Sequence, residues 1–158
     1  MELTHDELAG IVDLFGALSL SELATAGDEL AFKRGTELAG PDVDAALAAY
    51  RLVAFDPDAI TDRTTDEQLL AAGPTAFPAL PDGAEDLPHI LDVDACTPDR
   101  AALGAVVEER FRADAARAVA EDDHDRIARL LDVSYDLETW APVALDGVRD
   151  RLDTAAGD

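Results

Sequence analysis

The stretch that decides the fold is residues 4–34, THDELAGIVDLFGALSLSELATAGDELAFKR. It contains the same helix-start signal twice, a hydroxyl residue followed three positions later by a glutamate: Thr4 with Glu7, and Ser19 with Glu22. In such a capping box each side chain accepts a hydrogen bond from the other residue's backbone amide, which satisfies donors that a helix start leaves free. Apolar residues then recur at helical spacing, namely Leu8, Ile11, Val12, Phe15 and Leu18. The stretch therefore predicts two consecutive amphipathic helices.

The next residues predict a third helix and at least one strand. The helix carries Val43, Leu47 and Tyr50 on its apolar face, and the apolar run at 52–55 is typical of a short strand. Residues 68–72 fit either a helical turn or a second strand. Three short helices, a strand, a polar gap and a second strand follow the order of a winged helix-turn-helix, so we predict a winged-helix-like N-terminal part.

Beyond residue 72 the sequence changes character. Four prolines and two glycines between residues 73 and 88 indicate a long ordered loop or a linker. A helix is expected from a cap at Thr97 to about residue 120, a short one over 122–131, and a last one after Pro142.

These patterns predict a mainly α (α+β) fold with a small β element. We divide the chain into a winged-helix-like part (1–72), a Pro-rich connecting segment (73–96) and a C-terminal helical part (97–158). Whether the two outer parts share one core stays open, since a chain of 158 residues allows either arrangement.

The charge is extreme and of unusual make-up. Asp and Glu number 35 against 12 Lys and Arg, which gives a net charge of -23, and Lys33 is the sole lysine. Lysine has a long apolar stem, whereas Asp and Glu hold water and cations with little apolar surface. This surface favours a salt-loaded cytoplasm. No signal peptide or membrane span is visible, so we expect a cytoplasmic protein.

Several stretches together resemble a family of uncharacterised haloarchaeal proteins, and the likeness extends over nearly the whole chain. They are LAGIVDLFGAL (8–18), ELAFKRG (29–35), FPALPDGAEDLPHILDV (77–93), VEERFR (107–112) and LDVSYDLE (131–138). The resemblance implies a cytoplasmic halophilic protein, and it supplies no catalytic or binding residue.

No chemical motif is complete. Residues 56–67 partly match a calcium loop, but Ile60 and Thr61 occupy positions that need an acidic residue and a glycine. His124 lies among acidic residues that are better explained as a capped helix start. The Asp92-x-Asp94 pair has no accompanying phosphate loop, and Cys96 is better explained as a buried thiol. We therefore expect no cofactor and no metal, and a metal-dependent enzyme ranks third among the functions.

Two functions remain ahead of it. The first is a non-enzymatic protein-interaction module that uses exposed apolar residues, with Phe77 and Leu80 as anchors unless they fold back to cover the junction between the two halves. The alternative is a transcription-related DNA-binding protein that uses the basic residues Lys33, Arg34 and Arg51. The acidic start of the third helix would repel phosphate, which disfavours DNA.

Overall fold

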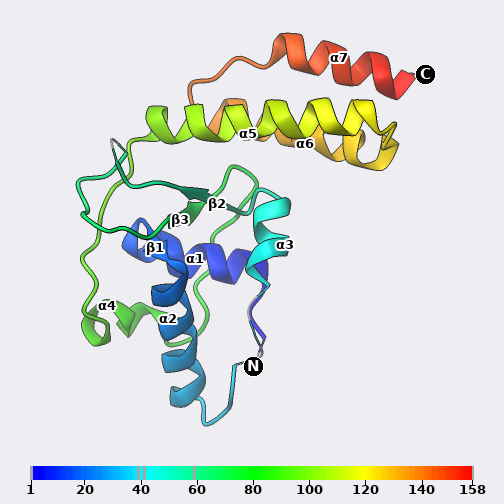
Figure 1. Ribbon diagram of the computed structural model, residues 1–158. Helices are drawn as coiled ribbons and strands as arrows, with labels where there is room; N and C mark the ends of the chain where they lie inside the picture. The colour runs from blue at the N-terminus through cyan, green and yellow to red at the C-terminus, as the bar shows by residue number, and fades with distance from the viewer. Residues whose placement is uncertain (1, 39, 41, 59, 158) are drawn as a thin grey trace. The chain divides into compact units, whose positions relative to one another are not determined.

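The computed structural model describes residues 2–38, 40, 42–58 and 60–157. The chain forms two compact units, residues 1–99 and residues 100–158. Helices dominate both units, and the first also holds a small antiparallel sheet (Figure 1). The predicted mainly α (α+β) class is thus confirmed. None of the helices in the described ranges is long and apolar enough to cross a membrane.

The first unit begins with the two predicted helices. Helix α1 (His5–Phe15) and helix α2 (Leu20–Lys33) each start at a complete capping box, on Thr4 and Ser19. Between them, β1 (Leu18–Ser19) uses the extended backbone of Ser19, so one residue both ends a strand and caps a helix. The apolar residues of this stretch recur at helical spacing, and that spacing does not predict a two-residue strand. The sequence analysis therefore did not predict β1.

Helix α3 (Val43–Ala48) precedes strands β2 (Leu52–Phe55) and β3 (Leu69–Ala72). The sheet order is β1–β3–β2 with both pairings antiparallel, and Leu70 lies opposite Leu18 on one side and Ala54 on the other. The ambiguous run at 68–72 is therefore a central strand, paired on both sides. Leu70 joins a core of α1 and α2 residues that includes Leu8, Ile11, Phe15, Leu23 and Leu30.

Residues 73–99, here called the return segment, run back along α1. The segment contains the 3-10 turn η1 (Ala84–Asp86) and the short helix α4 (Leu87–Ile90). The prolines and glycines of this segment predicted neither element. The amide of Ala79 donates to the carbonyl oxygen of Asp6 (3.0 Å), and the amide of Cys96 donates to that of Phe15 (2.9 Å). The return segment thus belongs to the first compact unit.

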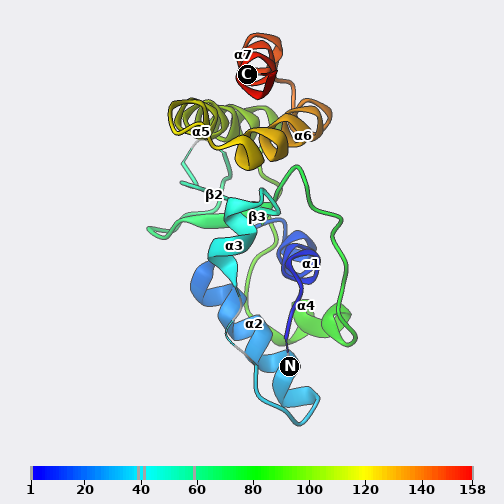
Figure 2. The same ribbon diagram turned by 90° about the vertical axis from the view of Figure 1, so that its right-hand side faces the viewer.

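The second unit consists of α5 (Arg100–Ala120), α6 (His124–Trp140) and α7 (Asp146–Gly157), which pack side by side (Figure 2). Its apolar core includes Leu103, Val107, Phe111, Ile127, Leu130, Leu137, Leu145 and Leu152. The expectation that a helix would end near residue 131 is wrong, because α6 continues to Trp140. Ser134 fits inside the helix because its hydroxyl donates to the carbonyl oxygen of Leu131.

Candidate functional site

Arg51 and Phe77, two of the predicted partner-binding residues, are brought together by Asp6 at the start of α1. Nη1 of Arg51 donates to the carbonyl oxygen of Thr75 (2.7 Å) and to Oδ1 of Asp6 (3.3 Å). The backbone amide of Phe77 donates to the same Oδ1 (3.1 Å). Arg51 therefore ties the return segment to α1, and this contact occupies one of its three guanidinium nitrogens.

Lys33 and Arg34 lie at the end of α2, where positive charge is favoured by the helix dipole. Nζ of Lys33 is 3.8 Å from Oδ2 of Asp86, and Nη2 of Arg34 donates to the carbonyl oxygen of Asp82 (2.8 Å). Both side chains are directed to the part of the return segment around η1. The basic cluster seen in the sequence is thus occupied by contacts within the same unit.

The phenylalanines fall into two groups. Phe15, Phe55 and Phe111 are at most 1% exposed, whereas Phe77 is 78% and Phe32 81% exposed. Leu80, the other predicted anchor, is 48% exposed. Phe32 was not among the predicted site residues, although its place in α2, away from the apolar stripe of Leu23, Ala26 and Leu30, was a usable signal.

The surface that a winged helix would turn to DNA is acidic here. Asp42 and Asp44, at the start of α3, are both exposed. The link between β2 and β3, residues 56–68 and here called the wing segment, has exposed acidic side chains at Asp56, Asp58, Asp62, Asp66 and Glu67.

The one basic residue of the wing segment, Arg63, is directed inward. It forms an ion pair with Glu22 of α2, and both side chains are at most 20% exposed. Burial by itself raises the pKa of Glu22, but hydrogen bonds from Arg63 and from the Ser19 amide together bring that pKa below its usual value. Arg63 therefore fixes the wing segment to α2 and leaves its acidic residues to face solvent.

A polar hollow of about 500 Å³ lies beside this ion pair, and Asp62, Asp92, Asp94 and Cys96 line it. Burial raises the pKa of the Cys96 thiol; Arg63 opposes this, while Asp62 and Glu22 add to it. A thiol with a raised pKa is a poor nucleophile. Among the described residues, no three His, Cys, Asp or Glu side chains are grouped to hold a metal ion. His124 opens α6, capped by Asp123.

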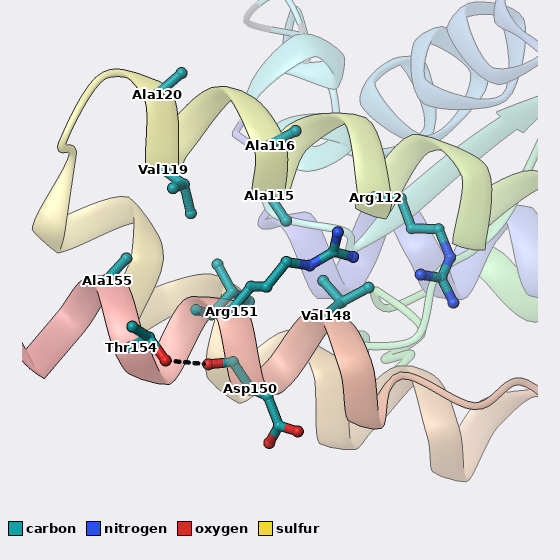
Figure 3. A pocket seen from close by; sticks show the side chains of 11 residues that line it. Arg112, Ala115, Ala116, Val119, Ala120, Val148, Asp150, Arg151, Thr154 and Ala155 are labelled. Carbon is teal, nitrogen blue, oxygen red and sulfur yellow. Dashed lines mark hydrogen bonds between the residues drawn. The ribbon is translucent and has the colours of Figure 1, made fainter.

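The second unit carries a larger hollow that the sequence did not reveal. A groove of about 840 Å³ runs between α5 and α7, and small and apolar side chains form most of its walls (Figure 3). Alanine-rich helix ends are ordinary helix formers, so nothing in their pattern distinguishes a groove wall from a solvated face.

Together these units define a mainly α protein with a small antiparallel sheet, an acidic surface and two phenylalanine side chains that are about four-fifths exposed. The chain belongs to a family of unknown function (DUF7109), whose sequence model matches residues 6–157. Neither a curated protein nor a solved structure matches it.

Proposed function

We propose that this protein is a non-enzymatic protein-interaction module whose first unit is winged-helix-like. The element order α1–β1–α2–α3–β2–β3, with the sheet order β1–β3–β2, supports the winged-helix assignment. Fold alone does not fix function, so the interaction role rests on the surface of that unit.

The observation that carries the proposal is the exposure of Phe32 and Phe77. Burying a phenylalanine side chain stabilises a protein by about 1.5–3 kcal/mol, so two side chains about four-fifths exposed forgo a large gain. Aromatic side chains are enriched in protein interfaces and dominate their binding energy. A protein partner that covers these rings would recover that gain.

DNA binding is the weaker alternative because of the charges around α3. Asp42, Asp44 and the wing segment would face the phosphates, while Lys33, Arg34 and Arg51 already hold the return segment. Molar salt would screen the repulsion, but it would also remove the counterion release that drives DNA affinity.

The working environment that we propose is a salt-rich cytoplasm. At a net charge of -23, the acidic side chains repel one another over a Debye length of about 30 Å in 0.01 M salt but only about 3 Å in 1 M salt. The melting temperature should therefore rise as KCl increases from 0.1 to 3 M. A melting temperature that stays constant over this range would contradict the halophilic assignment.

The interaction role is tested by purification of the tagged protein from cells of its own source, kept in molar KCl. Wild type should retain a specific protein, and the Phe32→Ser/Phe77→Ser double variant should lose it. Leu20→Ser removes another exposed apolar side chain, 58% exposed, and serves as the matched control. Retention of nuclease-sensitive material by all three proteins, with no specific protein, would favour the DNA alternative.

A further inference from the structure

The groove between α5 and α7 is formed because small side chains line both helices where they face each other. Ala115, Ala116 and Val119 form the α5 wall, and Val148, Leu152 and Ala155 form the α7 wall. Figure 3 shows Ala115 and Val119 directed toward α7. An alanine side chain is a single methyl group, so these walls leave a gap of about 840 Å³ that larger residues would fill.

The side chains that line the groove carry more positive than negative charge, whereas the chain as a whole is strongly negative. Arg112 of α5 lies at one end of it, and Figure 3 shows Arg151, from the middle of the α7 wall, reaching across toward α5. The acidic residue in the lining, Asp150, points away from α5. In a protein with 35 acidic and 12 basic residues, an apolar groove bordered by two guanidinium groups is a local exception.

The two arginines differ in what they contact. Nε of Arg112 donates to Glu108 (2.9 Å), and its Nη2 donates to the carbonyl oxygen of Ala144 (3.2 Å), so its position is fixed. Arg151 is exposed and makes no hydrogen bond or ion pair with the residues that the structure describes. Five N–H donors of Arg151 therefore remain available to an anionic group that enters the groove.

We propose that this groove binds one amphipathic, acidic helix of a protein partner. The proposal rests on the proposed function as an interaction module, and it names the site and the chemistry of the partner. The apolar face of the partner helix would pack between the α5 and α7 walls, and its Glu or Asp side chains would pair with Arg151 and lie beside Arg112, which keeps its bond to Glu108. Residues 112–120 span about 12 Å at 1.5 Å per residue, which matches two turns of the partner.

Charge decides between a partner helix and a second copy of this chain. A second copy has a net charge of -23, so the two chains would repel each other as they associate. An acidic helical segment would need to place its carboxylates only beside the two arginines. The groove also lies between two helices, and the ridges of a third helix fit such a depression.

The test uses the full chain in 1 M KCl and three labelled 14-residue peptides that favour helix. One has leucine at i, i+3, i+4 and i+7 with glutamate on both sides, the second replaces glutamate by lysine, and the third scrambles the leucines. Fluorescence anisotropy should show that the glutamate peptide binds about tenfold more tightly than either other peptide. Equal binding of all three, or no saturable binding of the glutamate peptide, would overturn the proposal.

Three variants locate the peptide. Arg151→Glu should weaken the glutamate peptide about tenfold. Val119→Trp, at a half-buried position whose side chain points toward α7, should fill the groove and abolish binding. Arg117→Glu reverses another exposed arginine of α5 outside the lining, and it should change affinity by less than about twofold. Circular dichroism of each variant separates lost binding from lost folding. Unchanged affinity in Arg151→Glu would refute the site.

Two further results separate this proposal from the proposed function. Phe32→Ser/Phe77→Ser should bind the glutamate peptide like wild type, because both side chains belong to the first unit. If that variant loses its cellular partner while Val119→Trp keeps it and no peptide binds, only the groove is refuted. A dimer in sedimentation that Val119→Trp dissociates would assign the groove to a second copy, against the proposal.

Discussion

In residues 2–99 main chain is laid directly against α1, in addition to the side-chain ties made by Arg51 and Arg63, whereas in residues 100–157 arginine side chains connect the helices. The return segment approaches so closely that a Cβ added at Gly10 would lie 2.1 Å from the Ala79 carbonyl oxygen, and one at Gly16 would lie 1.6 Å from that of Cys96. In the second unit, the Arg149 side chain of α7 reaches Glu138 and Tyr135 of α6 instead.

The two units should therefore be sensitive to different substitutions. Where the main chain of one segment packs directly against the main chain of another, there is no room for a Cβ atom. The first unit therefore depends on glycines at these positions. A side-chain bridge depends on the shape and charge of one residue, so the second unit depends on Arg149, only 9% exposed.

Gly16→Ala should destabilise the first unit by about 4 kcal/mol. Its φ of 87° disfavours any side chain, and the new methyl group would overlap the Cys96 carbonyl oxygen, so the return segment must move. Urea unfolding in 2 M KCl, followed by circular dichroism, measures the loss. Gly35→Ala is the control, because Gly35 has φ 66° but open space around it, and it should cost only about 1–2 kcal/mol. Equal losses would show that close packing of the return segment contributes nothing.

Arg149→Ala should destabilise the second unit by about 3 kcal/mol. The change removes the ion-pair partner of Glu138, which keeps only the Leu145 amide, and removes the guanidinium that lies 4.2 Å from the Tyr135 ring centroid and 3.6 Å from Asp146. Trp140, the sole tryptophan, lies in α6, so its fluorescence reports on this unit during urea unfolding. Arg117→Ala, at an exposed arginine of α5, should change stability by at most about 0.5 kcal/mol. A loss from Arg149→Ala no larger than this control would contradict the role of the bridge.

Lowering the pH should weaken both units from a common cause. The Leu145 amide, and then Arg149, hold the pKa of Glu138 below its usual value, and Glu22 also has a lowered pKa, because Arg63 and Ser19 outweigh its burial. A carboxyl group whose pKa is lower in the folded state stabilises the protein above its unfolded pKa and ceases to do so as the pH falls through the folded value.

We therefore expect the free energy of unfolding to fall as the pH drops below about 4.5, the usual value for glutamate. Urea titrations in 2 M KCl from pH 7 to pH 3 measure it, with Trp140 fluorescence for the second unit. Glu138→Gln cannot ionise and should flatten the dependence there while leaving that of the first unit unchanged. An unaltered pH profile of Trp140 in this variant would be inconsistent with the assigned cause.

The contrast also explains which features the sequence could predict. The starts of α1 and α2 depend on residues three apart, and both capping boxes formed as predicted. The path of the return segment depends on Gly10 and Gly16 meeting residues 69 and 80 positions away, so no local pattern reveals it. The predicted site residues Arg51 and Lys33 lie at the surface, but their partners, Asp6 and Asp86, are distant in sequence. The groove between α5 and α7 was missed because it is defined by side chains that are small.

The smallest expected effect concerns the helix starts, where the two units should not differ. The Thr4 hydroxyl oxygen accepts from the Glu7 amide (3.0 Å) in the first unit, and Oδ1 of Asp123 accepts from the Arg126 amide (3.1 Å) in the second. Thr4→Ala and Asp123→Ala should each cost about 1 kcal/mol in urea unfolding, because each removes one acceptor for a helix-opening amide. If the two variants lose the same free energy of unfolding, then the units differ in how their cores are closed and not in how their helices begin. A cost for Asp123→Ala close to that of Arg149→Ala would instead show that the whole second unit is marginal, and the contrast between main-chain and side-chain closure would fail.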